Sequence, residues 1–261
     1  MFTFTVSRRK TLAVLIFALA AVVAAAACVR GVQAVQASAP KRALPIYRVQ
    51  TDEKKIAISF DAAWGNEQTQ PLIDILKQYN VKTTFFVVGA WVDKYPDSAK
   101  ALVAAGHELG NHSDTHPHMP KLSQQQMTDQ ITACNEKIKS VTGTTPILFR
   151  PPYGDYKNPV INTVNGLKMY PIQWDVDSLD WKNPTPQQII NRVVSNVKPG
   201  SIVLFHNGAL NTPAALPTIL KTLQAQGYQI VPVSQLILRD NYKIDSAGMQ
   251  IPTNGGPSSS K

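Results

Sequence analysis

Short apolar segments alternate with longer segments of helical periodicity from Lys54 onward. The apolar segments are rich in β-branched and aromatic residues and predict strands. These strands are expected at residues 55–60, 83–88, 108–111, 147–149, 169–174, 201–205 and 229–232. The segments between them carry apolar residues at spacings of three and four, which predict helices. The helices are expected at 68–79, 97–105, 123–141, 158–167, 186–197 and 212–226, with a short helix from Ser234.

Strands that alternate with helices predict a parallel sheet, because parallel strands require crossover connections. An uninterrupted apolar strand such as SIVLF at 201–205 fits a sheet that is covered on both faces. About seven strand–helix units exceed most open sheets and approach the size of a (β/α) barrel. The expected fold class is therefore α/β, with a barrel-like domain over residues 54–240.

The two ends of the chain have different patterns. Basic residues at 8–10 precede an uncharged apolar run at 11–28. This arrangement is typical of a signal peptide or a signal anchor at 1–39, with a buried helix of the domain as the alternative. Residues 40–53 are expected to be a linker. The tail at 241–261 is rich in Gly, Ser, Pro and Asn and is predicted to be disordered.

The composition excludes several classes of protein. A chain with 44% hydrophobic and 16% charged residues is not fully disordered, and its 14 glycines show no collagen period. Its 2 cysteines, Cys28 and Cys134, form neither a disulfide framework nor a CxxC metal site. The net charge of +9 suits a protein near anionic cell-wall polymer or a membrane face. There is no basic stripe with interleaved aromatic residues, so we expect no nucleic-acid partner.

Reactive side chains follow the predicted strands, always at the same end. The carboxyl ends of parallel strands open on one face, where active sites of α/β proteins lie. We therefore expect these side chains to share one site. They are Asp61 after the first strand; His112 and His116 after the third; Arg150, Pro151 and Tyr153 after the fourth; Asp175, Asp177, Asp180 and Trp181 after the fifth; and His206 after the sixth.

The pair His112 and His116 is spaced by four residues. If this segment begins a helix, both imidazoles project to one side and can bind one divalent cation. The HxxxH spacing alone is weak, and the neighbouring carboxylates strengthen it. Two structural alternatives stay open: Asp61 as a helix N-cap, and His206 as a buried histidine without a role in a site.

Five segments in order carry a family resemblance. They are SFDAAWG at 59–65, GHELGNHSDTH at 106–116, FRPPYG at 149–154, DSLDW at 177–181 and LFH at 204–206. They resemble the motifs of NodB-type polysaccharide deacetylases, the family 4 carbohydrate esterases. The sequence FDAAWGNE in the first motif, together with a short leader, is most similar to sequences of the sporulation deacetylase subgroup called PdaB. The resemblance covers residues 54–238 and implies a distorted (β/α)7 barrel.

The resemblance also implies a role for each matching residue. Asp61 matches the catalytic base, Arg150 the group that tethers it, and His206 the general acid. Asp180 or Asp177 matches the carboxylate that orients His206. Metal ligands are implied at His112 and His116, for a divalent cation such as Zn²⁺. Substrate contacts are implied at Tyr153, Pro151, Trp181 and Leu204.

One position departs from the family pattern. The first motif usually has two adjacent aspartates, and the second one binds the metal, but here that position is Ala62. Either His112 and His116 hold the cation with water, or Asp114 or Glu67 is recruited as a further ligand, or the domain is a silent glycan-binding relic. A deacylase for a small N-acyl substrate is another, weaker alternative for the function.

The expected function is that of an exported, metal-dependent hydrolase, in sporulation, that removes N-acetyl groups from a cell-wall amino sugar polymer. A complete acid–base set favours retained activity over a silent domain. We expect a monomer whose contact with the membrane, if any, is made by the N-terminal segment.

Overall fold

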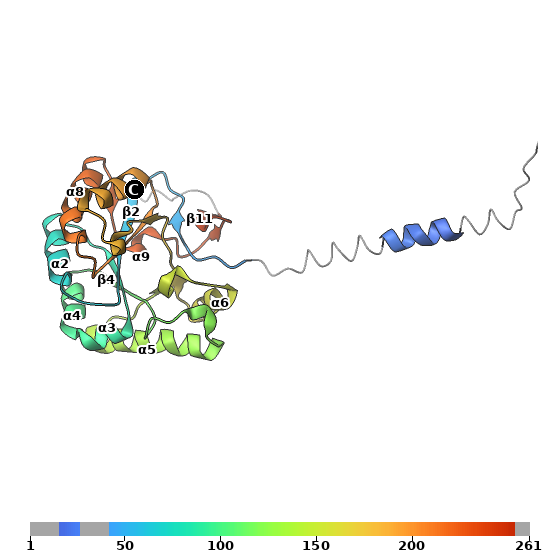
Figure 1. The fold of residues 1–261 in the computed structure, drawn as a ribbon, viewed down its shortest axis with the longest axis horizontal. Coiled ribbons are helices and arrows are strands. Elements are labelled where there is room, and N and C mark those ends of the chain that lie inside the picture. The colour runs from blue at the N-terminus through green and yellow to red at the C-terminus, as the bar shows by residue number, and fades with distance from the viewer. Residues whose placement is uncertain (1–15, 27–41, 254–261) are drawn as a thin grey trace, which may run out of the picture. The chain divides into compact units, whose positions relative to one another are not determined.

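The structure, a computed structural model, describes residues 16–26 and 42–253. Residues 16–26 form a helix, and a separate compact unit begins at Ala43 (Figure 1). Within these described ranges, no helix has both the length and the apolar character needed to cross a membrane. The rest of the predicted leader, including Cys28, and residues 254–261 of the predicted tail lie outside the described residues.

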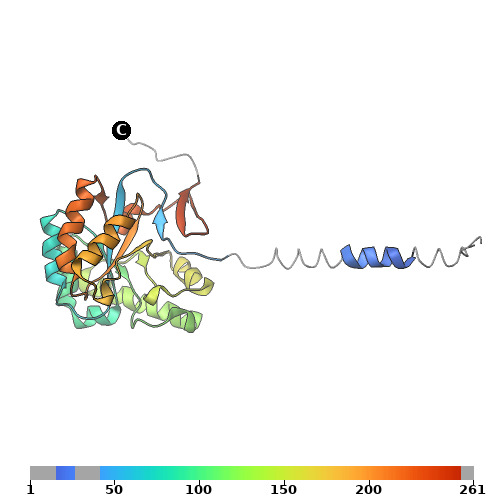
Figure 2. The ribbon, with the colours of Figure 1, turned by 45° about the horizontal axis from the view of Figure 1, so that its top comes forward.

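The compact unit is built on an 8-stranded sheet in which neighbouring strands run parallel. Helices surround this sheet (Figure 1, Figure 2). The strands are β2 Lys55–Ala62, β3 Thr84–Val87, β4 Glu108–Asn111, β5 Leu148–Phe149, β6 Tyr170–Pro171, β7 Val176–Asp177, β8 Ile202–His206 and β9 Gln229–Ile230. The helices are α2 Thr69–Gln78, α3 Gly89–Lys94, α4 Pro96–Ala104, α5 Gln124–Thr142, α6 Asn158–Gly166, α7 Pro186–Asn196, α8 Thr212–Ala225 and α9 Val233–Leu236. Short 3₁₀ turns are η1 Met119–Lys121, η2 Pro152–Gly154 and η3 Asp180–Lys182.

The main sheet is a barrel that stays open on one side, which confirms the expected distorted (β/α) fold. Its strand order is β6-β5-β4-β3-β2-β8-β7, with β9 beside β2. In the described chain the end strands β6 and β7 do not pair with each other. Instead, Ile46 bridges Ile172, which follows β6, and Arg48 bridges Ser201, which precedes β8. The prediction of a linker at 40–53 is therefore wrong for these residues, because their backbone is hydrogen-bonded to the domain.

The predicted tail also contains ordered strands. β1 Arg48–Val49, β11 Met249–Pro252 and β10 Tyr242–Ile244 form a second sheet in that order. The Ser, Gly and Asp residues between β10 and β11 belong to a hairpin turn, in which Asp245 Oδ1 accepts hydrogen bonds from two backbone N–H groups. The buried Gln250 side chain exchanges two 2.9 Å hydrogen bonds with the backbone of Leu238. The prediction of a disordered tail from 241 is therefore wrong as far as residue 252, because a hairpin turn rich in Gly, Ser and Asp has the same composition as a disordered segment.

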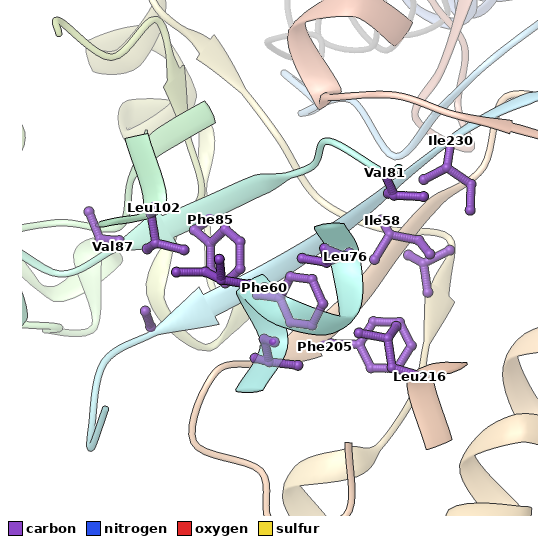
Figure 3. Close-up of a cluster of buried hydrophobic side chains, with 14 of the residues drawn as sticks. Ile58, Phe60, Leu76, Val81, Phe85, Val87, Leu102, Phe205, Leu216 and Ile230 are labelled. Carbon is purple, nitrogen blue, oxygen red and sulfur yellow. The ribbon is translucent and has the colours of Figure 1, made fainter. Parts of the chain in front are cut away.

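Aromatic packing aligns the three central strands. Phe60 of β2 stacks on Phe85 of β3 at 4.8 Å and on Phe205 of β8 at 5.5 Å between ring centroids (Figure 3). Leu72 and Leu76 of α2 are fully buried in the same cluster. Since parallel registers hold these rings side by side, the next residues along β2 and β8, Asp61 and His206, become direct partners across the sheet. The packing thus decides which polar groups meet at the carboxyl edge.

Most predicted elements are present, with a few differences. The predicted strand at 169–174 is shorter and is followed by a separate strand, β7. Helix α3 at Gly89–Lys94 was not predicted, because its six residues are too few to show a helical period. Helix α5 begins where expected, since Ser123 and Gln126 form a capping box.

Gly200 gives a test of how the N-terminal segment is held. Its φ is +81°, and a Cβ there would collide with the carbonyl oxygen of Val49. We expect Gly200→Ala to lower the free energy of unfolding by about 2 kcal/mol or more, because strain and a backbone clash add. Urea unfolding measures this. The matched change Gly166→Ala, in open space at the end of α6, should be neutral or stabilising. Equal effects of the two substitutions would contradict the close contact.

Candidate active site

One cavity of about 770 Å³ lies at the carboxyl edge of the barrel. It collects side chains from the ends of β2 and β8 and from the loops after β4, β5 and β7. Of the predicted site residues, the lining includes Asp61, His112, His116, Tyr153, Asp177, Trp181, Leu204 and His206. The expectation that one end of successive strands forms one site is therefore correct for these residues.

Two predicted positions lie elsewhere. Asp175 accepts hydrogen bonds from Ser201 Oγ and Ile202 N, at the start of β8. It therefore belongs to the opposite edge of the sheet from His206. Pro151 is buried and does not line the cavity, so the predicted substrate contact is wrong. Its carbonyl instead accepts the Gly154 N–H at 3.1 Å and shapes the turn that presents Tyr153.

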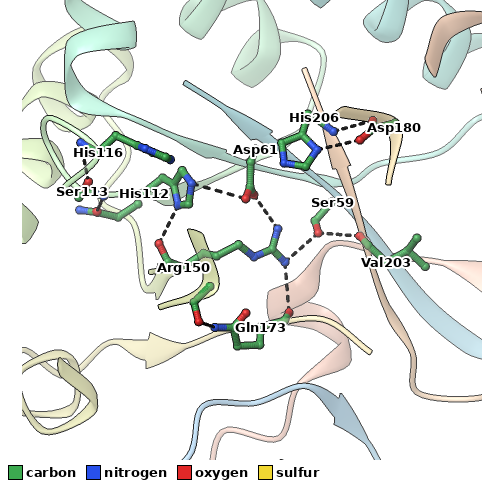
Figure 4. A network of polar contacts seen from close by, with 12 residues as sticks. Ser59, Asp61, His112, Ser113, His116, Arg150, Gln173, Asp180, Val203 and His206 are labelled. Atoms are coloured by element: carbon green, nitrogen blue, oxygen red, sulfur yellow. Dashed lines mark hydrogen bonds and ion pairs between the residues drawn. The ribbon is translucent and has the colours of Figure 1, made fainter. Parts of the chain in front are cut away.

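A buried ion pair forms the floor of the site. The fully buried Arg150 donates from Nη1 to Asp61 Oδ1 at 2.7 Å (Figure 4). Its Nη2 donates to Ser59 Oγ at 2.9 Å and to the Gln173 carbonyl at 3.3 Å. The ring of Phe86 lies 4.0 Å from the guanidinium carbon. The guanidinium therefore has partners on several sides and fixes one oxygen of the Asp61 carboxylate.

The surrounding charges keep Asp61 ionised. Desolvation alone would raise the pKa of this buried carboxyl, but Arg150 beside it, helped by His206, lowers that pKa below its usual value. His112 lies on the other oxygen, with Nε2 3.5 Å from Asp61 Oδ2. Asp61 is a hydrogen-bond acceptor in this setting and not the N-cap of a helix, because α2 begins only at Thr69.

The two candidate metal ligands come together, although not on a helix. His112 and His116 have ring centroids 4.9 Å apart. The segment between them is a turn in which Ser113 and His116 have positive φ values of 67° and 61°. The condition considered from the sequence, that this segment begins a helix, is therefore not met, because the Ser113 hydroxyl accepts the His116 N–H and closes the turn.

Both imidazoles are neutral in this environment and can each donate an electron pair to a cation. His112 Nδ1 donates to the Arg150 carbonyl at 2.7 Å, which leaves Nε2 unprotonated toward the cavity. His116 Nδ1 is buried and has no hydrogen-bond partner. Burial lowers the pKa of His112 and lowers that of His116 to about 4. A buried imidazole nitrogen without a partner, next to a second one, fits a divalent cation.

The donor set is nevertheless small. Among the described residues, no group of three or more His, Cys, Asp or Glu side chains is arranged to hold a metal ion. Ala62 is fully buried in the apolar core and supplies only a methyl group. Asp114, a possible replacement ligand, lies 2.7 Å from Lys137 Nζ. Glu67 accepts the Asn66 N–H and does not line the cavity. The chain thus offers two imidazoles, one ligand fewer than catalytic zinc sites usually have.

The second polar pair is His206 with Asp180. His206 Nδ1 lies 2.7 Å from Asp180 Oδ1, and its backbone N–H donates to Oδ2 at 2.8 Å. Thr212 Oγ1 donates to the same Oδ2 at 2.7 Å. Desolvation disfavours the charged imidazole, but the bond to Asp180 and the charge of Asp61 raise the pKa of His206. Asp180, and not Asp177, therefore orients His206; Asp177 Oδ1 accepts the Leu179 N–H.

The rim of the cavity is apolar. In the compact unit, every exposed large hydrophobic side chain that the structure describes lies on this rim, and these are Trp64, Tyr153, Trp181 and Leu210. Trp64 follows β2, in the first of the five sequence motifs. Leu210 was not predicted, because a single leucine in a loop gives no signal of its position. Exposed aromatic faces around a polar floor suit a ligand that has both apolar faces and polar edges.

Backbone strain gathers around the same cavity. Of the 8 residues other than glycine that have positive φ in the described part of the chain, five lie in its three loops: Ser113, His116, Tyr153, Leu179 and Asn183. Such conformations cost about 1–3 kcal/mol each and persist only where the surroundings hold them. The loops are therefore held in set positions.

Comparison with known proteins shows which family the chain resembles. The sequence model of the family described as "Polysaccharide deacetylase" matches residues 48–172. A peptidoglycan-N-acetylglucosamine deacetylase of Bacillus cereus is 37% identical over 196 residues, which cover 73% of this chain and 92% of that protein. The uncharacterized protein YlxY of Bacillus subtilis is 34% identical in the aligned region. That region covers 74% of this chain and 60% of YlxY.

Two solved structures of one protein are also similar to this chain in fold and sequence. The wild-type BA3943 protein of Bacillus anthracis, described as a CE4 family pseudoenzyme, has a TM-score of 0.72 and 36% identity, over 79% of this chain and 70% of that one. A BA3943 mutant described as having restored enzymatic activity gives the same TM-score of 0.72 at 37% identity, over 79% of this chain and 72% of that one.

The buried ion pair gives a test of the site's construction. Arg150→Met leaves the Asp61 carboxylate buried without its partner, so we expect the free energy of unfolding to fall by about 3–5 kcal/mol. Urea unfolding at pH 7 measures the loss. Adding Asp61→Asn to that variant removes the unpaired charge and should recover part of the loss. A double variant that is no more stable than Arg150→Met alone would contradict the pairing.

Proposed function

The chain belongs to the polysaccharide deacetylase family, hydrolases that act on amide bonds, and from this premise we propose that it removes N-acetyl groups from amino sugars of a peptidoglycan-type cell-wall glycan. The observation that carries the proposal is the pairing of Asp61 with Arg150 and of His206 with Asp180 in one cavity. The two pairs hold an ionised carboxylate and a readily protonated imidazole on neighbouring strands.

These two groups supply the proton transfers of amide hydrolysis. Asp61 accepts a proton from the attacking water, whose oxygen bonds to the acetyl carbon. His206, held by Asp180, donates a proton to the sugar nitrogen as the carbon–nitrogen bond breaks. Acetate and the free amine leave, and no covalent intermediate on the protein is required. The backbone N–H of Tyr153 is the expected donor to the carbonyl oxygen in the transition state.

A divalent cation would be held by His112 and His116. When bound, it would polarise the acetyl carbonyl and make water more acidic, which Zn²⁺ does in related chemistry. With two protein ligands in place of three, we expect weak binding that depends on the metal concentration.

The rim supports an amino sugar as the ligand. Trp64, Tyr153 and Trp181 offer apolar faces to pyranose rings, and Leu204 lines the same cavity and would form an apolar wall for the acetyl methyl group. The curated relative that acts on peptidoglycan N-acetylglucosamine points to the same substrate class.

The same proposal includes the setting of the reaction. We propose that the protein is exported through its N-terminal segment and acts as a monomer on wall glycan outside the cytoplasmic membrane, during sporulation. The FDAAWGNE wording of the first motif and the basic–apolar leader support this placement.

A silent glycan-binding domain is a second candidate function. Two observations favour it: Ala62 replaces a metal-binding carboxylate, and the similar BA3943 protein is described as a pseudoenzyme. Such a domain would use the same aromatic rim without hydrolysis.

Acetate release separates the two functions. We expect the full chain, supplied with millimolar Zn²⁺, to release acetate from N-acetylglucosamine oligomers or from purified peptidoglycan. His206→Ala should abolish the release while the variant stays folded. Tight glycan binding without acetate release at any Zn²⁺ concentration would favour the binding domain and contradict the hydrolase.

The pH profile tests the role of Asp180. Because the Asp180 carboxylate raises the pKa of His206, Asp180→Asn should lower that pKa. The acid form then disappears at lower pH, so the alkaline limb of kcat/KM should move to lower pH. Asp177→Asn is the matched control and should cause a smaller shift in the same direction. An alkaline limb that stays in place would exclude His206 as the general acid.

Restoring a carboxylate at position 62 tests the metal site. Ala62→Asp should bind Zn²⁺ at least about tenfold more tightly than the natural chain, because it adds a ligand. Without metal, the new carboxylate is buried in an apolar cluster and lowers the melting temperature. Zn²⁺ should therefore raise the melting temperature of this variant more than that of the natural chain. Ala62→Asn controls for size, and equal Zn²⁺ affinities in all three proteins would contradict the site.

A further inference from the structure

The loop after β4 and the loop after β5 meet along a row of rings. His116 contacts Tyr153, with ring centroids 4.5 Å apart. The other side of this contact is His118, whose imidazole stacks on Tyr153 at 4.2 Å with planes 18° apart. The Tyr153 ring is thus in contact with two imidazoles from one loop.

Both partners of the inner contact have a strained backbone. His116 has φ 61° and Tyr153 has φ 60°, in the left-handed region that residues with a side chain rarely adopt. Each needs support from its neighbours to stay there. The Tyr153 peptide carries the expected donor to the acetyl oxygen, and His116 is a candidate metal ligand. Any loss of support would therefore move groups that face the reacting atoms.

His118 joins the two loops a second time. Its Nδ1 lies 3.2 Å from Asp155 Oδ2, two residues after Tyr153. The Asp155 backbone N–H donates to the Pro152 carbonyl at 3.0 Å and closes the turn that holds Tyr153. The imidazole therefore contacts the Tyr153 ring and the side chain of a residue in the same turn.

We propose that His118, held by Asp155, is a positioning residue that fixes Tyr153 and His116 for the deacetylation. The inference rests on the proposed function, because it assigns His118 to that reaction. The side chains of His118 and Asp155 are 44% and 42% exposed, and exposed pairs of this kind add little to stability. Loss of the His118 side chain is therefore expected to change the geometry of the site and not the free energy of unfolding.

Three variants separate stacking from hydrogen bonding and from general damage. His118→Ala removes both contacts, and His118→Phe keeps a ring for stacking without the hydrogen bond to Asp155. Asp97→Asn is the control, because it breaks another exposed pair, with Lys100 at 3.6 Å, that does not line the cavity. For each we would measure kcat and KM on an N-acetylglucosamine tetramer, the Zn²⁺ affinity by calorimetry, and the amide exchange of Gly154 and Asp155.

We expect His118→Ala to lower kcat about 10- to 100-fold with KM changed far less, because misplaced catalytic groups cost rate at this scale. Its Zn²⁺ affinity should fall about tenfold, and its Gly154 and Asp155 amides should exchange faster. His118→Phe should restore most of kcat and of the slow exchange, and Asp97→Asn should change nothing.

The activity-independent measurements separate this inference from the proposed function. If the natural chain releases no acetate, the proposed function fails, and His118 is then judged by exchange and Zn²⁺ affinity alone. Unchanged exchange in His118→Ala overturns the positioning role whether or not the chain is active. Faster exchange with an unchanged kcat in an active chain also overturns it, as does a folded His118→Phe that restores nothing.

Discussion

The ion pair between Arg150 and Asp61 is the interaction on which the rest of the site depends. A charged guanidinium that is fully buried is tolerated only when it is paired, and here both of its terminal nitrogens donate hydrogen bonds, to Asp61, Ser59 and the Gln173 carbonyl. The Arg150 carbonyl also accepts from His112 and sets the tautomer of that imidazole. One residue after β5 therefore fixes both the carboxylate and a neighbouring histidine.

The proposed mechanism combines a complete acid–base pair with an incomplete set of candidate metal ligands. Burial keeps both His112 and His116 neutral, while Asp180 favours the charged form of His206. The same cavity thus contains histidines whose pKa values are shifted in opposite directions, and the difference comes from their neighbours. Only the methyl group of Ala62 stands where the family pattern has another carboxylate, so we expect that change to weaken metal binding and to leave the proposed proton-transfer groups in place.

The sequence predicts much of this arrangement and misses the rest for physical reasons. Apolar strands followed by Asp61, Arg150 or His206 predict the shared edge, because a parallel register brings strand ends together. The same rule fails for Asp175, since that residue directly precedes β7 and lies beside the start of β8. The helical spacing of His112 and His116 gives the correct neighbours in the wrong conformation, because a side-chain hydrogen bond of Ser113 closes a turn. Contacts between distant segments, such as Gln250 with Leu238, leave no local pattern.

The ionisation of Asp61 is the most direct measure of this account. Carbon NMR of the chain labelled at its aspartate carboxyls, with Asp61→Asn to identify the signal, gives the pKa of this group. The account predicts a carboxylate that stays ionised at pH 5 and above and titrates below the usual value of about 4. A signal that titrates near pH 6 or higher would show that desolvation outweighs Arg150, and would contradict the ion pair as the foundation of the site.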